Sequence, residues 1–383
     1  MKAMRCAYFE TEQCRSCPEI QTPYRTQLAD KDAATRHLLR DHVPDAAWHP
    51  IVASQPDHFR TKVKLAVGGT ALHPRLGFIE SDATVTDIRL CPIQDRAITT
   101  LLPELSAFIA RASLTPYDVA ARSGELKYLL ITVAPTGQAM LRFVLRSREA
   151  EARIRKHLPA LLAALPQLAV VSINLLPQHK AVTEGDQEIP LTSEQLLPVP
   201  LPGLTLFLPP KSFIQTNTQV ASELYQTAAT LVDRLSLPER SRIYDLYCGI
   251  GGFALSLAGA GRAITGVEIS APAIEAATRA AALLAPRAGQ SISFVAGDAL
   301  SWARQAQPAD LVVVNPPRRG IGAELAQWLN TNAPAVLYSS CNAASLASDL
   351  AHLPRLRPVY AQVFDMFPHT RHTETLVLLQ RED

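Results

Sequence analysis

The spacing of hydrophobic positions changes twice along the chain. Residues 24–43 carry Leu28, Leu38 and Leu39 at helical spacing, whereas from Phe59 apolar and polar residues alternate. A period of two predicts a strand, here one with a basic face, because successive side chains of a strand point to opposite sides. The spacing further predicts helices over 94–112 and 148–165, and strands over 127–134, 139–146, 169–176, 181–190 and 203–209. The middle third is therefore expected to be an α+β region.

After about residue 211 the pattern becomes a regular alternation of strands and helices. The expected strands are 243–248, 263–269, 291–297, 311–317, 335–341, 358–365 and 374–380. The expected helices are 218–234, 252–260, 271–284, 323–330 and 343–352. Most of these strands are continuous apolar runs, as expected for strands buried on both faces of a parallel sheet. The last two strands follow each other without a helix, so they should pair as a hairpin and reverse the final strand.

Length and patterning together suggest three parts. We expect a Cys-bearing loop and helix over residues 1–50, a central α+β domain over 51–210, and an α/β domain over 211–383. The 383 residues suffice for several cores, and 48% hydrophobic and 19% charged residues are ordinary for a globular protein. The formal net charge is only +2, so nucleic-acid contacts would have to come from local basic patches.

Neither the N-terminus nor any apolar run predicts a membrane or secretory segment. Residues 1–11 carry charge and lack an apolar core, unlike a signal peptide. The longest strand-like runs, such as 128–134, last about seven residues, which is too short to span a bilayer. We therefore expect a cytoplasmic protein, acting as a monomer.

Four motifs stand at the ends of four consecutive predicted strands. The segment 245–253 ends the first strand and opens a helix, and its Gly249 lets the backbone pass close to a ligand. Glu268 closes the second strand, where a carboxylate can accept both ribose hydroxyls of a nucleoside, while Asp298 and Asn315 follow the third and fourth. Dinucleotide enzymes also use glycine-rich turns. Four markers and a reversed final strand favour a Rossmann-like, class I methyltransferase sheet that binds S-adenosylmethionine (SAM) over an NAD enzyme.

A cysteine at the end of the fifth strand suggests covalent catalysis. Cys341 ends the segment Tyr-Ser-Ser-Cys, and its residue type alone would fit a buried core position. C5 of uracil is a poor nucleophile, but a thiolate added at C6 converts the ring to an enolate whose C5 can attack a methyl sulfonium. We expect Arg318, Arg319 and the following helix N-terminus to depress the pKa of this thiol. A base must then remove the C5 proton, and Glu374 at the start of the last strand is the candidate, although a single acid there could simply be solvated.

The motifs DLYCGIGGF, GVEIS, NPPRRGIG, YSSCN and DMFPHTRHTETLVLL resemble those of the RNA uracil-C5 methyltransferase family. The segment PKSFIQTN and the N-terminal cysteines extend the resemblance over essentially the whole chain. It implies that Cys341 is the nucleophile, Glu374 is the base, and Gln215, Tyr247, Glu268 and Asn315 contact SAM. Position 247 departs from the usual Phe but keeps an aromatic ring. The resemblance is strongest to members that methylate a uridine of 23S rRNA, and a uracil in a single-stranded loop enters such a pocket more easily than one in a duplex.

The N-terminal cysteines have a spacing that calls for a metal or a cluster. They are Cys6, Cys14, Cys17 and, far downstream in the central domain, Cys91. All-thiolate ligation fits structural zinc or an iron–sulfur cluster, and the spacing does not choose between them. The family resemblance favours a [4Fe–4S] cluster. The pattern is not that of radical-SAM enzymes, so we expect the cluster to tie the N-terminal loop to the central domain and to shape the RNA surface.

RNA contacts should come from basic patches around the catalytic edge, each of which could alternatively be an ordinary solvated face. The candidate patches are Arg60/Lys62/Lys64, Arg122/Lys127, Arg142/Arg146, Lys211 and Arg318/Arg319. Phe213 and Phe367 could stack on a base or could equally be core residues.

Rival functions are weakened by the motifs but not all removed. In N6-adenine methyltransferases an aromatic residue follows the NPP motif, whereas here Arg318 does. DNA cytosine-C5 enzymes place the nucleophile after the fourth strand, not after the fifth like Cys341. Methylation at another rRNA or tRNA uracil stays open, and so does a non-catalytic iron–sulfur RNA-binding protein, against which Cys341 and Glu374 argue.

Overall fold

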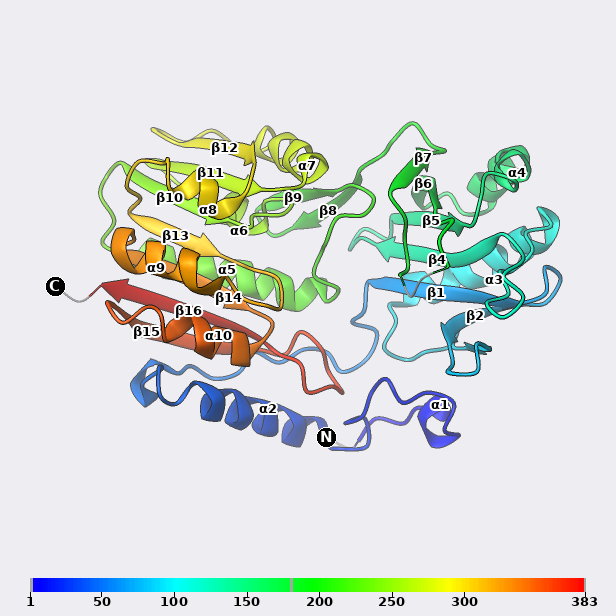
Figure 1. Ribbon diagram of the computed structural model, residues 1–383, viewed down its shortest axis with the longest axis horizontal. Coiled ribbons are helices and arrows are strands. Elements are labelled where there is room, and N and C mark those ends of the chain that lie inside the picture. The colour runs from blue at the N-terminus through cyan, green and yellow to red at the C-terminus, as the bar shows by residue number, and fades with distance from the viewer. Residues whose placement is uncertain (1–2, 180–181, 382–383) are drawn as a thin grey trace.

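Two seven-stranded sheets, each built from a separate part of the chain, lie side by side in the computed structural model, which describes residues 3–179 and 182–381 (Figure 1). The first sheet has the order β3-β2-β1-β4-β5-β6-β7. Its strands are β1 (Lys62–Gly69), β2 (Pro74–Ile79), β3 (Val85–Asp87), β4 (Leu126–Val133), β5 (Ala139–Leu145), β6 (Leu168–Leu175) and β7 (Gln187–Pro190). Neighbours pair antiparallel except β5 and β6, which are parallel and joined by α4 (Glu151–Ala164). This is the α+β arrangement expected for the middle of the chain.

The core of the first sheet lies under α3 (Arg96–Arg111) and α4. Leu101 and Phe108 of α3 pack with Leu129 and Phe143 of the sheet, and all four are fully buried. Strands β2 and β3 were not predicted from the spacing. The predicted strand 181–190 begins at residue 181, which lies outside the described residues, and the part that the structure describes is the shorter β7.

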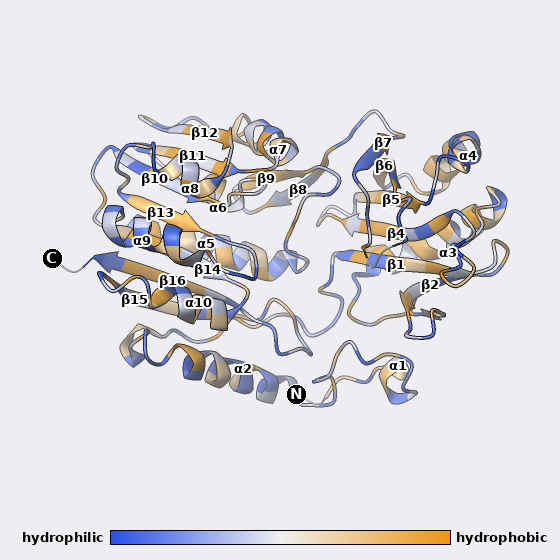
Figure 2. Ribbon diagram, viewed as in Figure 1, coloured by the Kyte–Doolittle hydropathy of each residue, from blue (hydrophilic) through white to orange (hydrophobic). Residues whose placement is uncertain are grey.

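The second sheet has the order β12-β11-β10-β13-β14-β16-β15. Its strands are β10 (Ser241–Leu246), β11 (Arg262–Glu268), β12 (Ser291–Ala296), β13 (Leu311–Val314), β14 (Ala335–Ser340), β15 (Leu356–Phe364) and β16 (Glu374–Arg381). Strand β16 runs antiparallel to both β14 and β15. The predicted hairpin and the reversed final strand are therefore confirmed. Hydrophobic residues concentrate along these strands, most visibly in β13, whose four residues are fully buried (Figure 2).

Six helices accompany this sheet within the described residues. They are α5 (Thr218–Arg234), α6 (Gly252–Ser256), α7 (Ala271–Ala281), α8 (Ala299–Ala303), α9 (Gly322–Asn332) and α10 (Ala343–Leu350). Residues of α5 and α6 form one core with the sheet, and residues of α8, α9 and α10 form another. The small hairpin of β8 (Leu197–Leu201) and β9 (Leu204–Leu208) packs against α7. Layers of helices on both faces of a mostly parallel sheet leave its strand ends free to form a site.

From Tyr24 to Val52 the N-terminal segment lies along the edge of the second sheet, whereas residues 7–10 lie beneath the first sheet (Figure 1). It contains α1 (Ala7–Glu10), α2 (Tyr24–Leu39) and the short helix η1 (Asp45–Ala47). Helix α2 packs on α10, and bridges join Trp48 to Ala361 and Val52 to Phe364 of strand β15. Covering an edge strand in this way protects its unpaired backbone groups. In the part of the chain that the structure describes, no helix has the length and apolarity needed to cross a membrane.

Candidate active site

The carboxyl ends of the parallel strands and the start of the reversed strand meet at one edge of the second sheet. Strands β10, β11, β13 and β14 run parallel, so Glu268, Asn315 and Cys341, which end or follow three of them, lie along that edge. Ser340 pairs with Thr375 in the β14–β16 ladder. This register sets Cys341, the residue after β14, opposite Glu374, the first residue of β16. The structure thus brings together residues that stand far apart in the sequence.

The turn after β10 has the backbone shape of a ligand cradle. Tyr247 and Gly249 adopt left-handed backbone angles, with φ of 68° and 54°. The N–H of Tyr247 donates to the carbonyl of Val267 at 3.0 Å, which ties the turn to the end of β11. A Cβ placed on Gly249 would meet no heavy atom within 4 Å, so the space in front of this backbone is open. A nucleoside-containing cofactor fits such an opening beside a helix N-terminus.

Glu268 and Asp298 both stand at this opening, but with different partners. Glu268 accepts hydrogen bonds from the N–H groups of Gly249 at 3.3 Å and Ser270 at 3.0 Å, which fixes its carboxylate over the turn. Asp298 caps α8 by accepting from the N–H of Ser301 at 2.9 Å, and this bond lowers the pKa of Asp298. A capping role was not foreseen for Asp298. Its expected contact with an adenine edge stays a prediction.

Cys341 is half-buried between the end of β14 and α10. Burial raises the pKa of its thiol, the facing charge of Glu374 raises it further, and Arg318 acts in the opposite direction. The expected depression of this pKa is therefore wrong for the protein without its ligands. The physical reason is that desolvation and a neighbouring carboxylate outweigh one solvent-exposed guanidinium. The charge of Arg319 acts on Tyr247 instead, whose pKa it lowers against the effect of burial.

Glu374 is enclosed by the protein, with 1% of its surface exposed. Burial raises its pKa to about 7, although hydrogen bonds from the side chains of Ser339 and Gln215 pull in the opposite direction. The Ser339 hydroxyl donates to Oε1 of Glu374 at 2.5 Å. A carboxylate with a pKa near neutrality suits a general base. Gln215, expected to contact SAM, is itself buried and here supports Glu374; its cofactor contact stays a prediction.

Asp245, at the start of the glycine turn, is a site residue that the sequence did not single out individually. Its Oδ2 accepts from the N–H of Ala254 at 2.9 Å, while its Oδ1 is buried without a hydrogen-bond partner. Burial raises the pKa of Asp245 to about 7, and the charge of Glu268 adds to this shift. An unpartnered buried carboxylate oxygen beside an open cradle fits a site that receives a polar ligand.

The N-terminal cysteines lie near one another: Cys6 directly precedes α1, Cys14 and Cys17 follow that helix, and Cys91 belongs to the segment before α3. Cys17 is buried, and Cys6 and Cys91 pack against the same small apolar cluster, which includes Phe59. Burial raises the pKa of Cys17 to about 12, and the other three thiols raise it further. Arg60 opposes these shifts, and its Nε is buried with no hydrogen-bond partner.

The charge of Arg60 acts on Cys17 and Cys91, and its unpartnered N–H could donate a hydrogen bond to an anionic guest beside them. Nevertheless, within residues 3–179 and 182–381 no group of three or more Cys, His, Asp or Glu side chains is arranged so that it could hold a metal ion as it stands. The cysteines therefore lie near one another, but their side chains are not arranged as the ligands of a metal ion.

One residue in each of three proposed basic patches is held inside the protein, whereas Lys64 and Arg122 of the same patches are exposed. Arg142 is buried and forms ion pairs with Glu184 at 2.6 Å and Glu188 at 2.7 Å. Lys127 is buried, and its ammonium donates to the carbonyl of Gln178 at 2.9 Å. The expectation that these residues offer a basic surface to RNA is wrong, because their charges are satisfied internally.

Lys62 also points inward, toward the loop that carries Phe213. Its ammonium donates to the carbonyl of Ser212 at 3.0 Å, and burial lowers its pKa to about 8. Phe213 itself is 71% exposed, whereas Phe367 is half-buried. Arg318 and Arg319 are exposed beside the catalytic edge. This pair is the proposed patch that lies at the catalytic edge, where Nη2 of Arg318 lies 3.2 Å from Nδ1 of His372.

Comparison with known proteins decides the family. The model of the family described as tRNA (Uracil-5-)-methyltransferase matches residues 23–285 and 304–382, most of the chain. The chain belongs to this RNA uracil-C5 methyltransferase family. A general methyltransferase domain model also matches residues 243–331, which contain the glycine turn and Glu268. Membership makes the protein a SAM-dependent enzyme that methylates uracil C5 in RNA.

Curated relatives extend over the whole chain. The 23S rRNA (uracil(747)-C(5))-methyltransferase RlmC of Yersinia enterocolitica is 44% identical over 379 residues, covering 98% of this chain and 99% of the relative. The enzyme of the same name from Serratia proteamaculans is 45% identical over 381 residues, covering 99% and 100%.

A solved structure has the same fold. The Pyrococcus abyssi tRNA (uracil-54, C5)-methyltransferase, in complex with S-adenosyl-L-homocysteine, superposes with a TM-score of 0.77 at 23% identity. The superposition covers 96% of this chain and 84% of that one. The class I methyltransferase fold predicted from the motifs is thereby confirmed.

Proposed function

We propose that the enzyme converts a uridine of 23S rRNA to 5-methyluridine, at the position equivalent to uracil-747. Relatives that carry this name match the chain from end to end at 44–45% identity. The family model and the archaeal structure are named for tRNA, but that structure is only 23% identical. The observation that carries the chemistry is the register of β14 and β16, which sets Cys341 opposite Glu374 beside the cofactor cradle.

The first step we propose belongs to Cys341. Its thiolate adds to C6 of the uracil, a C6–S bond forms, and the electrons of the C5–C6 double bond move toward the C4 carbonyl to give an enolate. Arg318 is positioned to favour the thiolate, since its charge lowers the pKa of Cys341. SAM, when bound, supplies an electrophilic methyl group for the nucleophilic C5 of this enolate.

The second step belongs to Glu374. After methylation, C5 carries both a methyl group and a proton, and Glu374 removes the proton. The electron pair of the C5–H bond then re-forms the C5–C6 double bond and expels the Cys341 thiolate. With a pKa of about 7, Glu374 can hold a proton and return it to solvent near neutral pH. Ser339 and Gln215 keep its carboxyl group in place through hydrogen bonds.

We propose that SAM lies over the glycine turn. Gly249 would meet the ligand with its backbone and Glu268 would accept the ribose hydroxyls. Gln215, Tyr247, Asp298 and Asn315 complete the proposed contacts. The open space at Gly249 and the unpartnered Oδ1 of Asp245 support a ligand here.

We also propose a [4Fe–4S] cluster held by Cys6, Cys14, Cys17 and Cys91. The thiols of Cys6, Cys14 and Cys91 all raise the pKa of Cys17, which supports their lying close to it, and the unpaired Nε of Arg60 offers a hydrogen bond to an anionic cluster. The ligand set would tie the N-terminal loop to the start of α3, so no redox role is needed. Iron and sulfide analysis of anaerobically purified protein tests this. One zinc and no sulfide per chain would contradict it.

The proposed RNA surface is the rim of the catalytic edge. Arg318 and Arg319 are exposed there, and the exposed ring of Phe213 could stack on the target base or a neighbour in a single-stranded loop. In the proposed division, residues 51–210 bind RNA and residues 211–383 carry the chemistry. This division is supported by the two sheets, which fall one in each part. A monomer working in the cytoplasm, where ribosomal RNA is made, stays an expectation.

Labelled SAM and unmodified RNA test the proposed substrate. The protein is incubated with unmodified 23S rRNA and with unmodified tRNA, and the labelled nucleotide is mapped. We expect label at one 23S uridine, as 5-methyluridine. Label on tRNA alone would overturn the rRNA assignment, and no label on either RNA would favour the non-catalytic RNA-binding alternative.

A further inference from the structure

The position of Glu374 in the site depends on the turn that joins the last two strands. Phe364, the last residue of β15, pairs with Glu374, the first residue of β16. Asp365 therefore stands at one end of the turn formed by residues 365–373, and Glu374 follows its other end. Any displacement of this turn moves the carboxyl group of Glu374, which is the general base in the proposed function.

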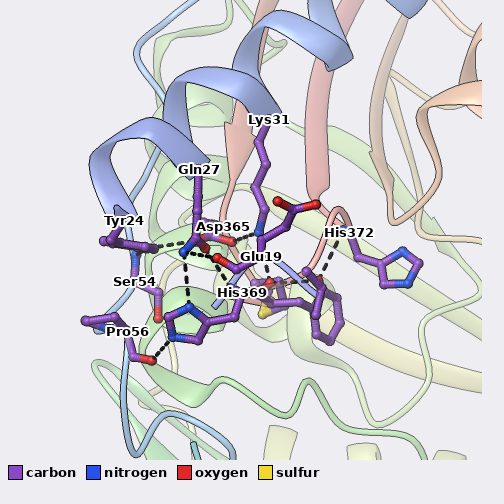
Figure 3. A network of polar contacts seen from close by, with 12 residues as sticks. Glu19, Tyr24, Gln27, Lys31, Ser54, Pro56, Asp365, His369 and His372 are labelled. Atoms are coloured by element: carbon purple, nitrogen blue, oxygen red, sulfur yellow. Dashed lines mark hydrogen bonds and ion pairs between the residues drawn. The ribbon is translucent and has the colours of Figure 1, made fainter. Parts of the chain in front are cut away.

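Helix α2 holds the first residue of this turn, Asp365, through a buried ion pair (Figure 3). The Lys31 ammonium lies 2.5 Å from Oδ1 of Asp365, and their side chains are 4% and 0% exposed. Lys31 also donates to the carbonyl of Phe367 at 2.9 Å, inside the turn. The Tyr24 hydroxyl donates to Oδ2 of Asp365 at 2.6 Å and accepts from the N–H of Ser54 at 2.8 Å. Both carboxylate oxygens of Asp365 are thus bound from α2.

A second pair of contacts holds the middle of the turn (Figure 3). The N–H of His369 donates to Oε1 of Gln27 at 2.9 Å, and Nε2 of Gln27 lies 3.2 Å from Nδ1 of His369. Nε2 of His369 lies 2.6 Å from the carbonyl of Pro56, which requires a proton on that nitrogen and leaves Nδ1 as the acceptor. His369 is fully buried with a left-handed φ of 64°, a backbone position that persists only where its surroundings hold it.

The physical character of this network favours a geometric role. A buried ion pair adds little net stability compared with apolar residues of similar size, because desolvation offsets the attraction. Separating the two partners would leave a buried charge without its counter-ion, which costs several kcal/mol. The pair therefore favours one relative arrangement of the two segments that carry it. Since Lys31 and Asp365 come from the two ends of the chain, the arrangement that they fix is that of α2 and the 365–373 turn.

We propose that Tyr24, Gln27 and Lys31 are positioning residues, which clamp the 365–373 turn so that Glu374 reaches the proton on uracil C5. This inference rests on the proposed role of Glu374 as the base. A loosened clamp should affect proton removal but not methyl transfer, whereas a loss of folding would affect both steps. Cys341 is attached to β14, outside the clamped turn, so a loosened clamp leaves thiol addition and methyl transfer in place. Proton removal slows, and the methylated RNA stays bonded to the protein.

The test is a single-turnover reaction of full-length protein, purified anaerobically, with labelled SAM and a 23S rRNA fragment. Two quantities are followed: labelled RNA–protein adduct that resists detergent, and free RNA containing 5-methyluridine. In the double variant Lys31→Met/Asp365→Asn, which removes both charges at similar volume, we expect release of free product to fall about 10- to 100-fold, the loss typical of a catalytic group misplaced by roughly 1 Å. Label should accumulate in the adduct. Tyr24→Phe, a smaller change, should give the same signature more weakly.

A matched control lies on the same helix. Arg36 contacts Asp32 and the ring of Trp48 rather than the turn. Arg36→Met therefore removes a charge from α2 but leaves the contacts of Tyr24, Gln27 and Lys31 with the turn intact, and it should not trap the adduct. Parallel losses of methyl transfer and release in the clamp variants, with no adduct, would overturn the proposal, as would wild-type release from them.

Glu374→Gln separates the two proposals and keeps the test informative if the double variant folds poorly. If Glu374→Gln releases product at the wild-type rate, the assignment of the base is wrong and the clamp has no base to position. If Glu374→Gln traps the adduct while Tyr24→Phe and the double variant do not, only the positioning role is wrong.

Discussion

Burying an ionisable acid at the catalytic edge should cost the protein stability, and this cost can be measured. Burial raises the pKa of Glu374 from its ordinary value of 4.5 to about 7. Each pKa unit corresponds to about 1.4 kcal/mol, so the ionised carboxylate destabilises the folded state by about 3 kcal/mol at pH 8. Below pH 4.5 the group is protonated in both states and the cost is absent. It grows between pH 4.5 and 7 and is constant above.

Replacing Glu374 with Gln removes this cost but keeps an acceptor for the Ser339 hydroxyl. We therefore expect Glu374→Gln to be more stable than wild type by up to about 3 kcal/mol at pH 8, with the gain shrinking toward zero near pH 4.5. Chemical denaturation of both proteins at pH 5 and pH 8 measures the difference. Glu275→Gln, at an exposed position of α7, is the control and should change stability by less than about 0.5 kcal/mol at either pH. A gain for Glu374→Gln that does not depend on pH would refute the raised pKa.

Three further changes test neighbouring parts of the account. Arg318→Met removes the charge that favours the thiolate and should slow adduct formation at pH 7 about 3- to 10-fold, with recovery at higher pH; a loss that is equal at all pH values would contradict this. Ser339→Ala should raise the pKa of Glu374 further, so the pH at which product release is half-maximal should move upward in single-turnover assays; an unchanged midpoint would contradict it. Arg142→Met should destabilise the protein by about 2 kcal/mol, because two partly buried glutamates lose their buried partner, yet leave the salt dependence of RNA binding unchanged. A weaker salt dependence would restore Arg142 to the RNA surface.

Much of the second sheet could be predicted because its strands are buried on both faces. Continuous apolar runs such as 311–314 are visible without knowing their neighbours, and α5 begins and ends where its spacing predicted. By contrast, β3 has three residues and α8 has five, too few for a periodic pattern to emerge. The convergence of Cys341 and Glu374 was also accessible, since it follows from strand direction.

Interactions between distant segments could not be predicted. Lys31 and Asp365 are 334 positions apart, and nothing in either local sequence indicates a partner. Arg142 stood on a strand with other basic residues nearby and was assigned to a basic surface, because its glutamate partners lie more than 40 positions away. The pKa of Cys341 was misjudged for a related reason. Nearby arginines are visible in sequence, whereas burial and a facing carboxylate are properties of the folded chain.

In the proposed mechanism Cys341 forms a bond to uracil C6, and a base must remove the C5 proton before this bond breaks again. RNA carrying 5-fluorouridine at the target position tests both halves, since fluorine at C5 cannot be removed as a proton and the adduct should persist. With SAM present, we predict a detergent-resistant protein–RNA adduct whose modified peptide contains Cys341, and no adduct from Cys341→Ala although that variant still binds SAM. An adduct that maps to Cys248, or its formation by Cys341→Ala, would contradict the account.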